Sequence, residues 1–176
     1  HEHYSYLSLG AVQRVAEAHG LVVFDVQELP THGGSLRVFV QRRDTGRRAV
    51  EPTVALLRER EHSAGMDSAG FYRGFQARAD RVKNDFMAFL IESQRAGLRV
   101  AAYGAAAKGN TLMNFAGVRP DLLAYVVDRN PAKQGKYMPG SRIPIVGEER
   151  LAQDKPDHIV ILPWNLSAEV MAQLDY

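Results

Sequence analysis

The 176-residue sequence contains no cysteine, which excludes several kinds of site from this chain. A disulfide framework, a thiolate zinc site, a catalytic thiol and an iron–sulfur cluster all require that residue. Long apolar runs are also missing, because runs such as Leu122 to Val127 are far shorter than the ~20 residues of a membrane-spanning helix. The chain begins neither with Met nor with a basic-then-apolar leader. We therefore expect either that the chain is a piece of a longer protein that is cut at His1, or that His1 is left over from recombinant expression.

Charge is nearly balanced over the whole chain but not along it. There are 22 Lys and Arg against 20 Asp and Glu, while residues 37–60 carry seven arginines against three acidic residues. A nucleic-acid-binding protein usually shows a wider basic face with interleaved aromatic residues, so we expect no nucleic-acid partner. The basic segment is interpreted as a solvated linker or tethering surface, with a polyanion site as the alternative.

Residues 1–45 have the pattern of the end of a larger sheet. Ser8 is a good N-cap for a helix, and a strand rich in Val and Phe follows it over residues 21–29. After a turn at residues 30–34, residues 36–41 alternate with the period of a half-buried strand. Two strands joined by a turn are marginal without a sheet to join. We therefore expect the earlier strands of this sheet to be absent from the chain.

Residues 46–66 are expected to form a connector with a short helix from about residue 53 to residue 61. Asp67 or Ser68 then caps a long helix that ends at Gly97. Apolar side chains recur along this helix at three- and four-residue steps: Phe71, Phe75, Val82, Phe86, Phe89 and Leu90. We interpret this stripe as packing surface.

From Leu98 onward, strands and helices alternate with short links. The predicted strands are residues 100–103, 122–127, a short one near Ile143 and Ile145, and 158–162; the predicted helices are residues 109–116, 148–153 and 167–174. A nearly all-apolar strand is typical of burial on both faces. The predicted fold class is therefore α/β, with a Rossmann-like, doubly wound parallel sheet over residues 67–176.

The link between the first of these strands and its helix is the first candidate site. It carries a degenerate G-x-G-x-x-G pattern in which Ala106 takes the middle position: Tyr103, Gly104, Ala105, Ala106, Ala107, Lys108, Gly109, Asn110 and Thr111. Ligands of α/β folds bind at the carboxyl ends of strands, and a helix N-terminus favours an anion. Lys108 adds a positive charge, and Asn110 and Thr111 add donors. The alternative is a tight strand–helix turn with a surface lysine.

Polar residues after the next strand support a nucleotide site. Asp128 lies 24 residues after Gly104, near the position of a ribose-binding acid. Basic and polar residues follow it: Arg129, Lys133, Gln134, Lys136 and Tyr137. The alternative is a solvated loop.

Three further segments carry polar or aromatic residues. The segment His1-Glu2-His3 allows an inert terminus, a general acid or base, or part of a metal site, since a neighbouring carboxylate can orient an imidazole. His32-Gly33-Gly34-Ser35 is either a plain hairpin turn or a place of close ligand approach. Trp164-Asn165 follows the last strand and either caps a ligand or joins the core.

Five segments in order carry a resemblance to a known family. They are His1-Glu2-His3-Tyr4-Ser5-Tyr6-Leu7-Ser8-Leu9, Thr31-His32-Gly33-Gly34-Ser35-Leu36-Arg37, Tyr103 to Thr111, Val127-Asp128-Arg129-Asn130-Pro131 and Leu162-Pro163-Trp164-Asn165. Together they resemble the sugar C-methyltransferases of deoxysugar biosynthesis, which use S-adenosylmethionine to methylate C3 of a nucleotide-linked 4-keto sugar.

The resemblance implies which parts of such an enzyme are present. Residues 1–45 would end a class I methyltransferase domain with its terminal helix and antiparallel hairpin, and residues 67–176 would be the C-terminal, sugar-nucleotide-binding domain. The cysteine-ligated zinc module and the glycine-rich S-adenosylmethionine loop of the family are absent, and so is the Tyr that usually precedes the His-Glu-His segment. A cytoplasmic enzyme without a membrane partner is expected, and this chain alone would bind nucleotide sugar without catalysis.

The resemblance also implies residue roles. His3 matches the family's base, which removes the C3 proton to give an enolate, and Glu2 is its neighbouring carboxylate. The resemblance implies a thymidine-diphosphate sugar as the substrate. Further residues would contact it: His32, Ser35, Tyr103, Gly104, Lys108, Asn110, Thr111, Asp128, Arg129, Lys133, Trp164 and Asn165. No metal ligand is expected within the chain. The rival hypothesis is a non-catalytic Rossmann-like module that binds a nucleotide or dinucleotide.

Overall fold

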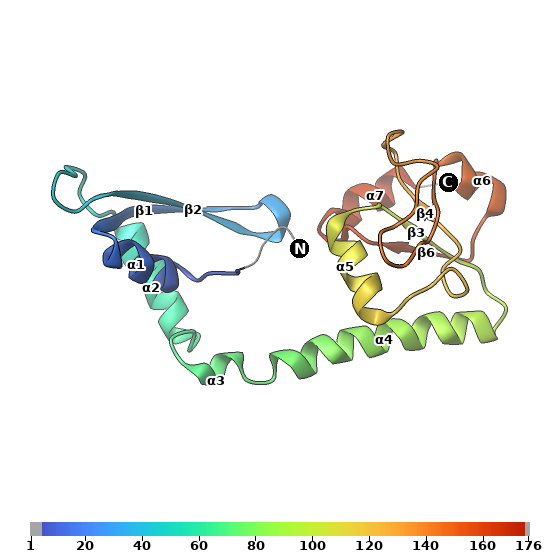
Figure 1. The fold of residues 1–176 in the computed structure, drawn as a ribbon, viewed down its shortest axis with the longest axis horizontal. Helices are drawn as coiled ribbons and strands as arrows, with labels where there is room; N and C mark the ends of the chain where they lie inside the picture. The colour runs from blue at the N-terminus through green and yellow to red at the C-terminus, as the bar shows by residue number, and fades with distance from the viewer. Residues whose placement is uncertain (1–4, 175–176) are drawn as a thin grey trace. The chain divides into compact units, whose positions relative to one another are not determined.

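The computed structural model describes residues 5–174 and, for His32, the backbone only. These residues form two compact units that meet in sequence at Phe75 and Gln76. Figure 1 shows the helices and strands of each unit in colours that run along the chain. The two units are described separately below.

The first unit is built on an antiparallel hairpin. Its elements are α1 (Leu9–Ala18), β1 (Leu21–Leu29), the 3-10 turn η1 (Thr31–Gly33), β2 (Ser35–Arg42), α2 (Pro52–Ser63) and α3 (Ala69–Tyr72). The strands pair from Leu21 opposite Arg42 to Leu29 opposite Ser35, with an irregularity after Val23. Ser8 caps α1 as predicted, because its hydroxyl accepts a hydrogen bond from the N–H of Ala11 at 3.2 Å.

The helix α2 belongs to the core of the first unit. The buried apolar side chains of this core are Leu9, Ala16, Val23, Val26, Val54 and Leu57. Val54 and Leu57 come from α2, which lies in the segment expected to be a connector. Burying an apolar side chain of this size stabilises a fold by roughly 1.5–3 kcal/mol. Residues 52–63 are therefore an integral part of the first unit.

The long helix predicted from residue 67 or 68 to residue 96 is interrupted. A single turn, α3, is followed by α4 (Phe75–Arg95), and Gly74 between them has a φ of 79°. This left-handed conformation favours glycine and cannot continue a helix. The predicted packing stripe is wrong at its amino-terminal end, since Phe75 and Val82 are 65% and 58% exposed.

The second unit contains a four-stranded parallel sheet. After α4 its elements are β3 (Val100–Tyr103), α5 (Ala107–Ala116), β4 (Val126–Val127), β5 (Ile145–Val146), α6 (Glu149–Asp154), β6 (His158–Ile161), the 3-10 turn η2 (Trp164–Leu166) and α7 (Ser167–Gln173). The order across the sheet is β5-β4-β3-β6. The α/β class and the parallel sheet are as predicted. However, β4 spans only Val126–Val127, whereas a strand over residues 122–127 was predicted. β6 is an edge strand and is partly exposed.

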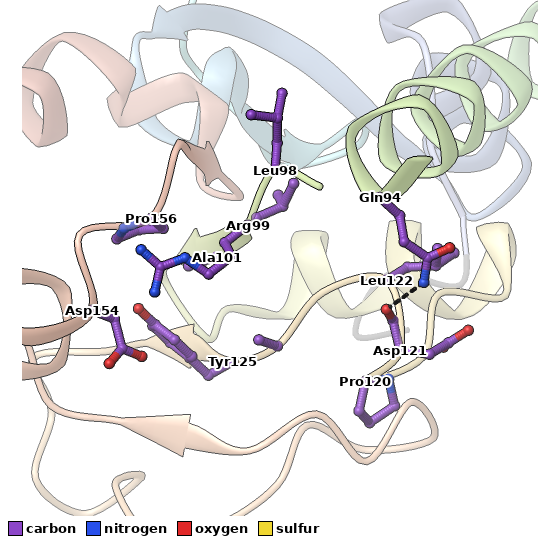
Figure 2. Close-up of a pocket in the computed structure, with 12 residues that line it drawn as sticks. Gln94, Leu98, Arg99, Ala101, Pro120, Asp121, Leu122, Tyr125, Asp154 and Pro156 are labelled. Carbon is purple, nitrogen blue, oxygen red and sulfur yellow. Dashed lines mark hydrogen bonds between the residues drawn. The ribbon is translucent and has the colours of Figure 1, made fainter. Parts of the chain in front are cut away.

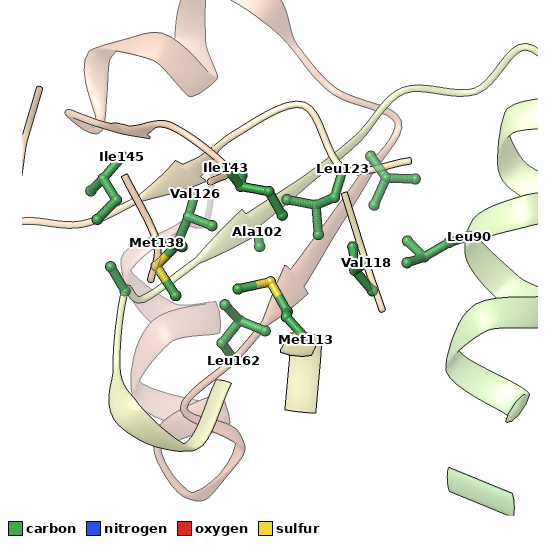
Figure 3. Close-up of a cluster of buried hydrophobic side chains, with 12 residues drawn as sticks. Leu90, Ala102, Met113, Val118, Leu123, Val126, Met138, Ile143, Ile145 and Leu162 are labelled. Carbon is green, nitrogen blue, oxygen red and sulfur yellow. The ribbon is translucent and has the colours of Figure 1, made fainter. Parts of the chain in front are cut away.

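Both faces of the sheet are covered. Successive residues of a strand point to opposite faces, so the strand side chains divide between two cores. Ala102 and Val126 face a core shared with Leu90 of α4 and Met113 of α5, as Figure 3 shows. On the other face lie six buried residues: Ala101, Tyr103, Tyr125, Val127, Leu151 and Val170. Helices therefore lie on both sides of the sheet. Within the described residues, no helix is long and apolar enough to cross a membrane.

Candidate functional site

The strand order creates a junction at the centre of the sheet. The first strand of the unit, β3, lies between β4 and the last strand, β6. The chain leaves β3 toward α5 and leaves β6 toward η2 at the same edge, because the strands are parallel. In open α/β sheets, ligands bind at the carboxyl ends of strands where the strand order reverses. The loops after β3, β4 and β6 therefore define the candidate site.

Two glycines allow the loop after β3 to lie against the end of β6. A Cβ on Gly109 would lie 2.5 Å from Cβ of Leu162, and one on Gly104 would lie 2.5 Å from Cδ of Pro163. Gly104 also has a φ of 92°, which disfavours any other residue. The degenerate glycine pattern is thus explained by close packing of two chain segments.

The helix α5 begins directly after Ala106. Ala106 is the N-cap and makes no capping hydrogen bond through its side chain. The first N–H groups of a helix have no partner within the helix, and they carry partial positive charge. The amino end of α5 therefore offers donors to an acceptor that lies in front of Ala106 and Ala107.

A pocket of about 450 Å³ opens beside this helix end. Its polar or charged lining comes from Asn110, Lys133, Lys136 and Tyr137, and its remaining wall is Ala105, Ala106, Ala107, Ala132, Met138, Pro139 and Ile145. The side-chain oxygen of Asn110 is buried and has no hydrogen-bond partner among the described residues. The ammonium group of Lys136 beside a helix N-terminus makes this pocket suited to an anion, whereas the ammonium group of Lys133 is paired with Asp128.

Residues 132–139 form the loop that closes this pocket, and only part of it was identified from the sequence as a candidate site. Met138 and Pro139 have no polar character, and Tyr137 forms an isolated bridge with Pro144 that folds this loop back on itself. The N–H of Met138 also donates to the carbonyl of Ile143 at 2.8 Å. The basic residues after Asp128 are the sequence signal for the loop, but its return to the sheet depends on these contacts.

Asp128 is held inside the protein by three donors. Its Oδ2 accepts hydrogen bonds from the N–H of Ala105 at 2.8 Å and from Nζ of Lys133 at 3.0 Å. Its Oδ1 accepts one from the N–H of Asn130 at 2.9 Å. The residue is 9% exposed. Its carboxylate therefore bridges the loops that follow β3 and β4.

Lys108 lies away from the pocket that Asn110 lines. Its Nζ is 3.3 Å from Oδ1 of Asn165 and 5.7 Å from the ring centroid of Trp164. Trp164 is 53% exposed, so it is not a core residue. Thr111 donates its hydroxyl to the carbonyl of Ala107. The structure thus places Lys108 and Asn110, two of the predicted substrate-binding residues, in different surroundings.

A second polar cluster lies on the opposite face of the sheet. The hydroxyl of Tyr103 donates to Oε1 of Glu148 at 2.6 Å and lies 3.4 Å from Oε1 of Gln173. Arg129 lies 3.6 Å from Glu148 and donates to Gln173 at 3.3 Å. Burial, followed by the hydrogen bond to Glu148, raises the pKa of Tyr103 to about 12. Tyr103 is therefore a neutral donor, and this cluster joins the ends of β3 and α7.

The remaining predicted site residues belong to the first unit. Ser35 helps to line a hollow of about 420 Å³ together with Tyr6, Leu7 and residues of the hairpin. Its hydroxyl donates to the carbonyl of Thr31 at 3.0 Å. Glu2 and His3 lie outside the described residues, and the side chain of His32 is not described. Across residues 5–174, no group of three or more His, Cys, Asp or Glu could hold a metal ion.

A smaller hollow of about 180 Å³ lies at the amino-terminal edge of the parallel sheet. Figure 2 shows Tyr125 pointing between Arg99 and Asp154, with Gln94 hydrogen-bonded to the carbonyl of Asp121 at the other end. Burial raises the pKa of the Tyr125 hydroxyl. None of the residues singled out as site candidates lines this hollow.

Comparison with known proteins places the chain in a family. Residues 30–176 match the sequence model of the C-methyltransferase C-terminal domain. The chain belongs to this C-methyltransferase family. It is 37% identical over 171 residues to the C-methyltransferase NovU of Streptomyces niveus, an alignment that covers 97% of this chain and 40% of NovU. The family resemblance found in the sequence is therefore confirmed, and the chain spans about two-fifths of the length of this C-methyltransferase relative.

Proposed function

We propose that this chain is the C-terminal part of an enzyme that methylates C3 of a nucleotide-diphosphate-linked 4-keto deoxysugar. Family membership, the ordered sequence motifs and the 37% identity to a C-methyltransferase support this proposal. In it, residues 76–176 form a Rossmann-like domain that holds the sugar nucleotide, and residues up to Phe75 complete the methyltransferase domain.

The observation that carries the proposal is the pocket beside the amino end of α5. Lys136 brings positive charge to a wall that contains the helix start at Ala106 and Ala107, and Lys133 in the same wall is paired with Asp128. A diphosphate is a compact anion with many acceptor oxygens, which matches an ammonium group beside the positive end of a helix. We assign the diphosphate of the substrate to this pocket, and its Met138 and Pro139 wall to an apolar part of the ligand.

His3 and Glu2 supply the acid–base chemistry in this proposal. His3 would take the C3 proton, which is acidified by the neighbouring C4 ketone, and Glu2 would orient the imidazole. A positioned general base contributes about 10²–10⁴-fold to a rate. S-adenosylmethionine would supply the methyl group. The described part of the first unit offers a two-stranded hairpin and no parallel sheet edge for that cofactor, so we place its site mainly outside this chain.

Calorimetry of this chain tests the proposal directly. The three ligands are a thymidine-diphosphate sugar, NAD and S-adenosylmethionine. We expect the nucleotide sugar to bind and S-adenosylmethionine not to bind. Lys136→Met should weaken nucleotide-sugar binding, and Lys155→Met, which removes the same charge outside the pocket, should not. Binding of NAD alone would instead support the non-catalytic dinucleotide-binding module.

A further inference from the structure

Asp128 stands at the position where dinucleotide-binding folds place an acid that contacts ribose. It ends β4 at the carboxyl edge of the sheet, and its N–H donates to the carbonyl of Val146 at 3.0 Å. The geometry points to a different task. We propose that Asp128 is a positioning residue that builds the wall of the anion pocket and does not itself bind the nucleoside. This inference rests on the proposed function of that pocket.

The first reason is that the carboxylate is already engaged. Three protein donors take up both oxygens, at distances of 2.8, 2.9 and 3.0 Å. The side chain of Asp128 is 12% exposed. A ribose-binding acid needs an accessible oxygen that accepts from a sugar hydroxyl, and an ionised carboxylate offers about four acceptor positions in all. Asp128 is also not among the described residues that line the pocket, so it lies behind the wall.

The second reason is that Asp128 and Lys133 hold the N–H and the carbonyl of one residue, Ala105. Asp128 accepts from the N–H of Ala105, and Nζ of Lys133 donates to the carbonyl of Ala105 at 2.9 Å. The two side chains also contact each other at 3.0 Å. Ala105 is the first residue of the pocket wall and leads directly into α5. The Asp128–Lys133 pair therefore fixes the position of the helix N–H groups that would meet the anion.

The third reason is that the same residue fixes the opposite side of the pocket. The carbonyl of Asp128 accepts a hydrogen bond from Nε2 of Gln134 at 2.9 Å, and its Oδ1 holds the N–H of Asn130. These contacts shape the loop that brings Lys133 and Lys136 to the pocket. Asp128 thus links the two chain segments whose separation sets the width of the site.

This role predicts which ligands bind more weakly when Asp128 is replaced. Asn cannot accept from all three donors, because its amide nitrogen is itself a donor. In the Asp128→Asn variant we expect the affinities for inorganic pyrophosphate and thymidine diphosphate to fall by the same factor, on the order of tenfold, since the anion would lose about one hydrogen bond to the displaced helix start. The affinity for thymidine, which lacks phosphate, should not change.

Calorimetry of the full chain with these three probes separates the alternatives. If Asp128 instead accepted a hydrogen bond from the 3′-hydroxyl of the deoxyribose, the variant would bind thymidine diphosphate more weakly and pyrophosphate unchanged, which overturns the inference. Tighter binding of pyrophosphate would show that Asp128 only repels the anion, and this also overturns it. The matched control is Asp157→Asn, because Asp157 accepts from the N–H of Arg99 at 2.7 Å at the other end of β3. That variant should leave all three affinities unchanged.

Amide hydrogen exchange keeps the inference testable if the pocket binds no phosphate at all. In that case the proposed function of the pocket fails. Amide exchange alone then tests whether Asp128 and Lys133 hold Ala105 in place. We expect Asp128→Asn and Lys133→Met each to accelerate exchange at Ala105, and the double variant to add little. Exchange at Val26 in the first unit serves as the internal reference. Unchanged exchange at Ala105 in both single variants would contradict the positioning role.

Discussion

The carboxylate of Glu61 accepts a hydrogen bond of 2.9 Å from the backbone N–H of Gly10, which lies 51 residues earlier in the chain. The N–H of Leu9 donates to the same carboxylate. Glu61 is 6% exposed and is paired with Arg58 at 2.6 Å. A side chain of α2 therefore satisfies the first turn of α1, where negative charge is favourable.

Replacing Glu61 should destabilise the first unit more than any surface change on the same helix. Glu61→Gln removes the charge that faces the α1 N-terminus and Arg58, and we expect a loss of about 2 kcal/mol in the free energy of unfolding. Urea denaturation measures this loss. Glu59→Gln, at an exposed position that contacts Ser63, is the matched control. Equal stability of the two variants would contradict the capping role.

Gly109→Ala should destabilise the second unit although the residue lies in a helix. Alanine normally stabilises a helix interior by roughly 0.5–1 kcal/mol relative to glycine. Here the added Cβ meets Leu162 at the end of β6, so we expect a net loss of roughly 1–3 kcal/mol. Gly70→Ala in α3, where the nearest atom is 3.4 Å away, should be neutral or stabilising. Thermal unfolding that shows the same sign for both variants would be the contrary result.

Tyr103 should remain protonated well above the ordinary range of tyrosine. Its pKa is raised to about 12 by burial and by Glu148. A folded-state pKa above the unfolded value stabilises the fold below pH 10, and this stabilisation is lost as the pH rises toward 12. Ultraviolet titration of the native chain and of Tyr103→Phe should differ by one phenol that ionises near pH 12. A difference that titrates near pH 10 would contradict the assignment.

Lys108 and Lys136 should contribute unequally to the binding of a small anion. Lys136 lines the pocket, whereas Lys108 contacts Trp164 and Asn165 outside it. We expect Lys136→Met to lower the affinity for pyrophosphate several-fold, and Lys108→Met to lower it by at most about twofold, as expected for a more distant, screened charge. Calorimetry measures both. A larger effect of Lys108→Met would place the anion on the Trp164 side of α5.

His3 should be essential for turnover in the intact enzyme. If His3 is the base, His3→Ala should lower turnover by about 10²–10⁴-fold and leave the affinity for S-adenosylmethionine intact. Steady-state kinetics with a nucleotide-linked 4-keto sugar, together with cofactor binding, measures both quantities. His19→Ala, at the exposed end of α1, is the control. Near-normal turnover of His3→Ala would remove this residue from its role.

Local sequence features predicted much of the fold. The helix–strand–turn–strand order of the first unit and the strand–helix alternation of the second follow from periodicity and capping, which depend on neighbouring residues. The break at Gly74 was missed because the apolar stripe continues across it while the backbone φ there is 79°. Exposure of Phe75 and Val82 was missed for a related reason, since periodicity identifies an apolar face but not its partner.

The sequence likewise predicted only part of the candidate site. The sequence by itself determined the family, through motifs at fixed positions, and placed Gly104, Lys108, Asn110 and Asp128 at the carboxyl edge of a parallel sheet. Only the tertiary structure decided that Lys108 and Asn110 lie in different surroundings and that Asp128 accepts a hydrogen bond from the N–H of Ala105. The physical reason is that side-chain direction and hydrogen-bond partners depend on segments far apart in the chain, which meet only when the sheet is formed.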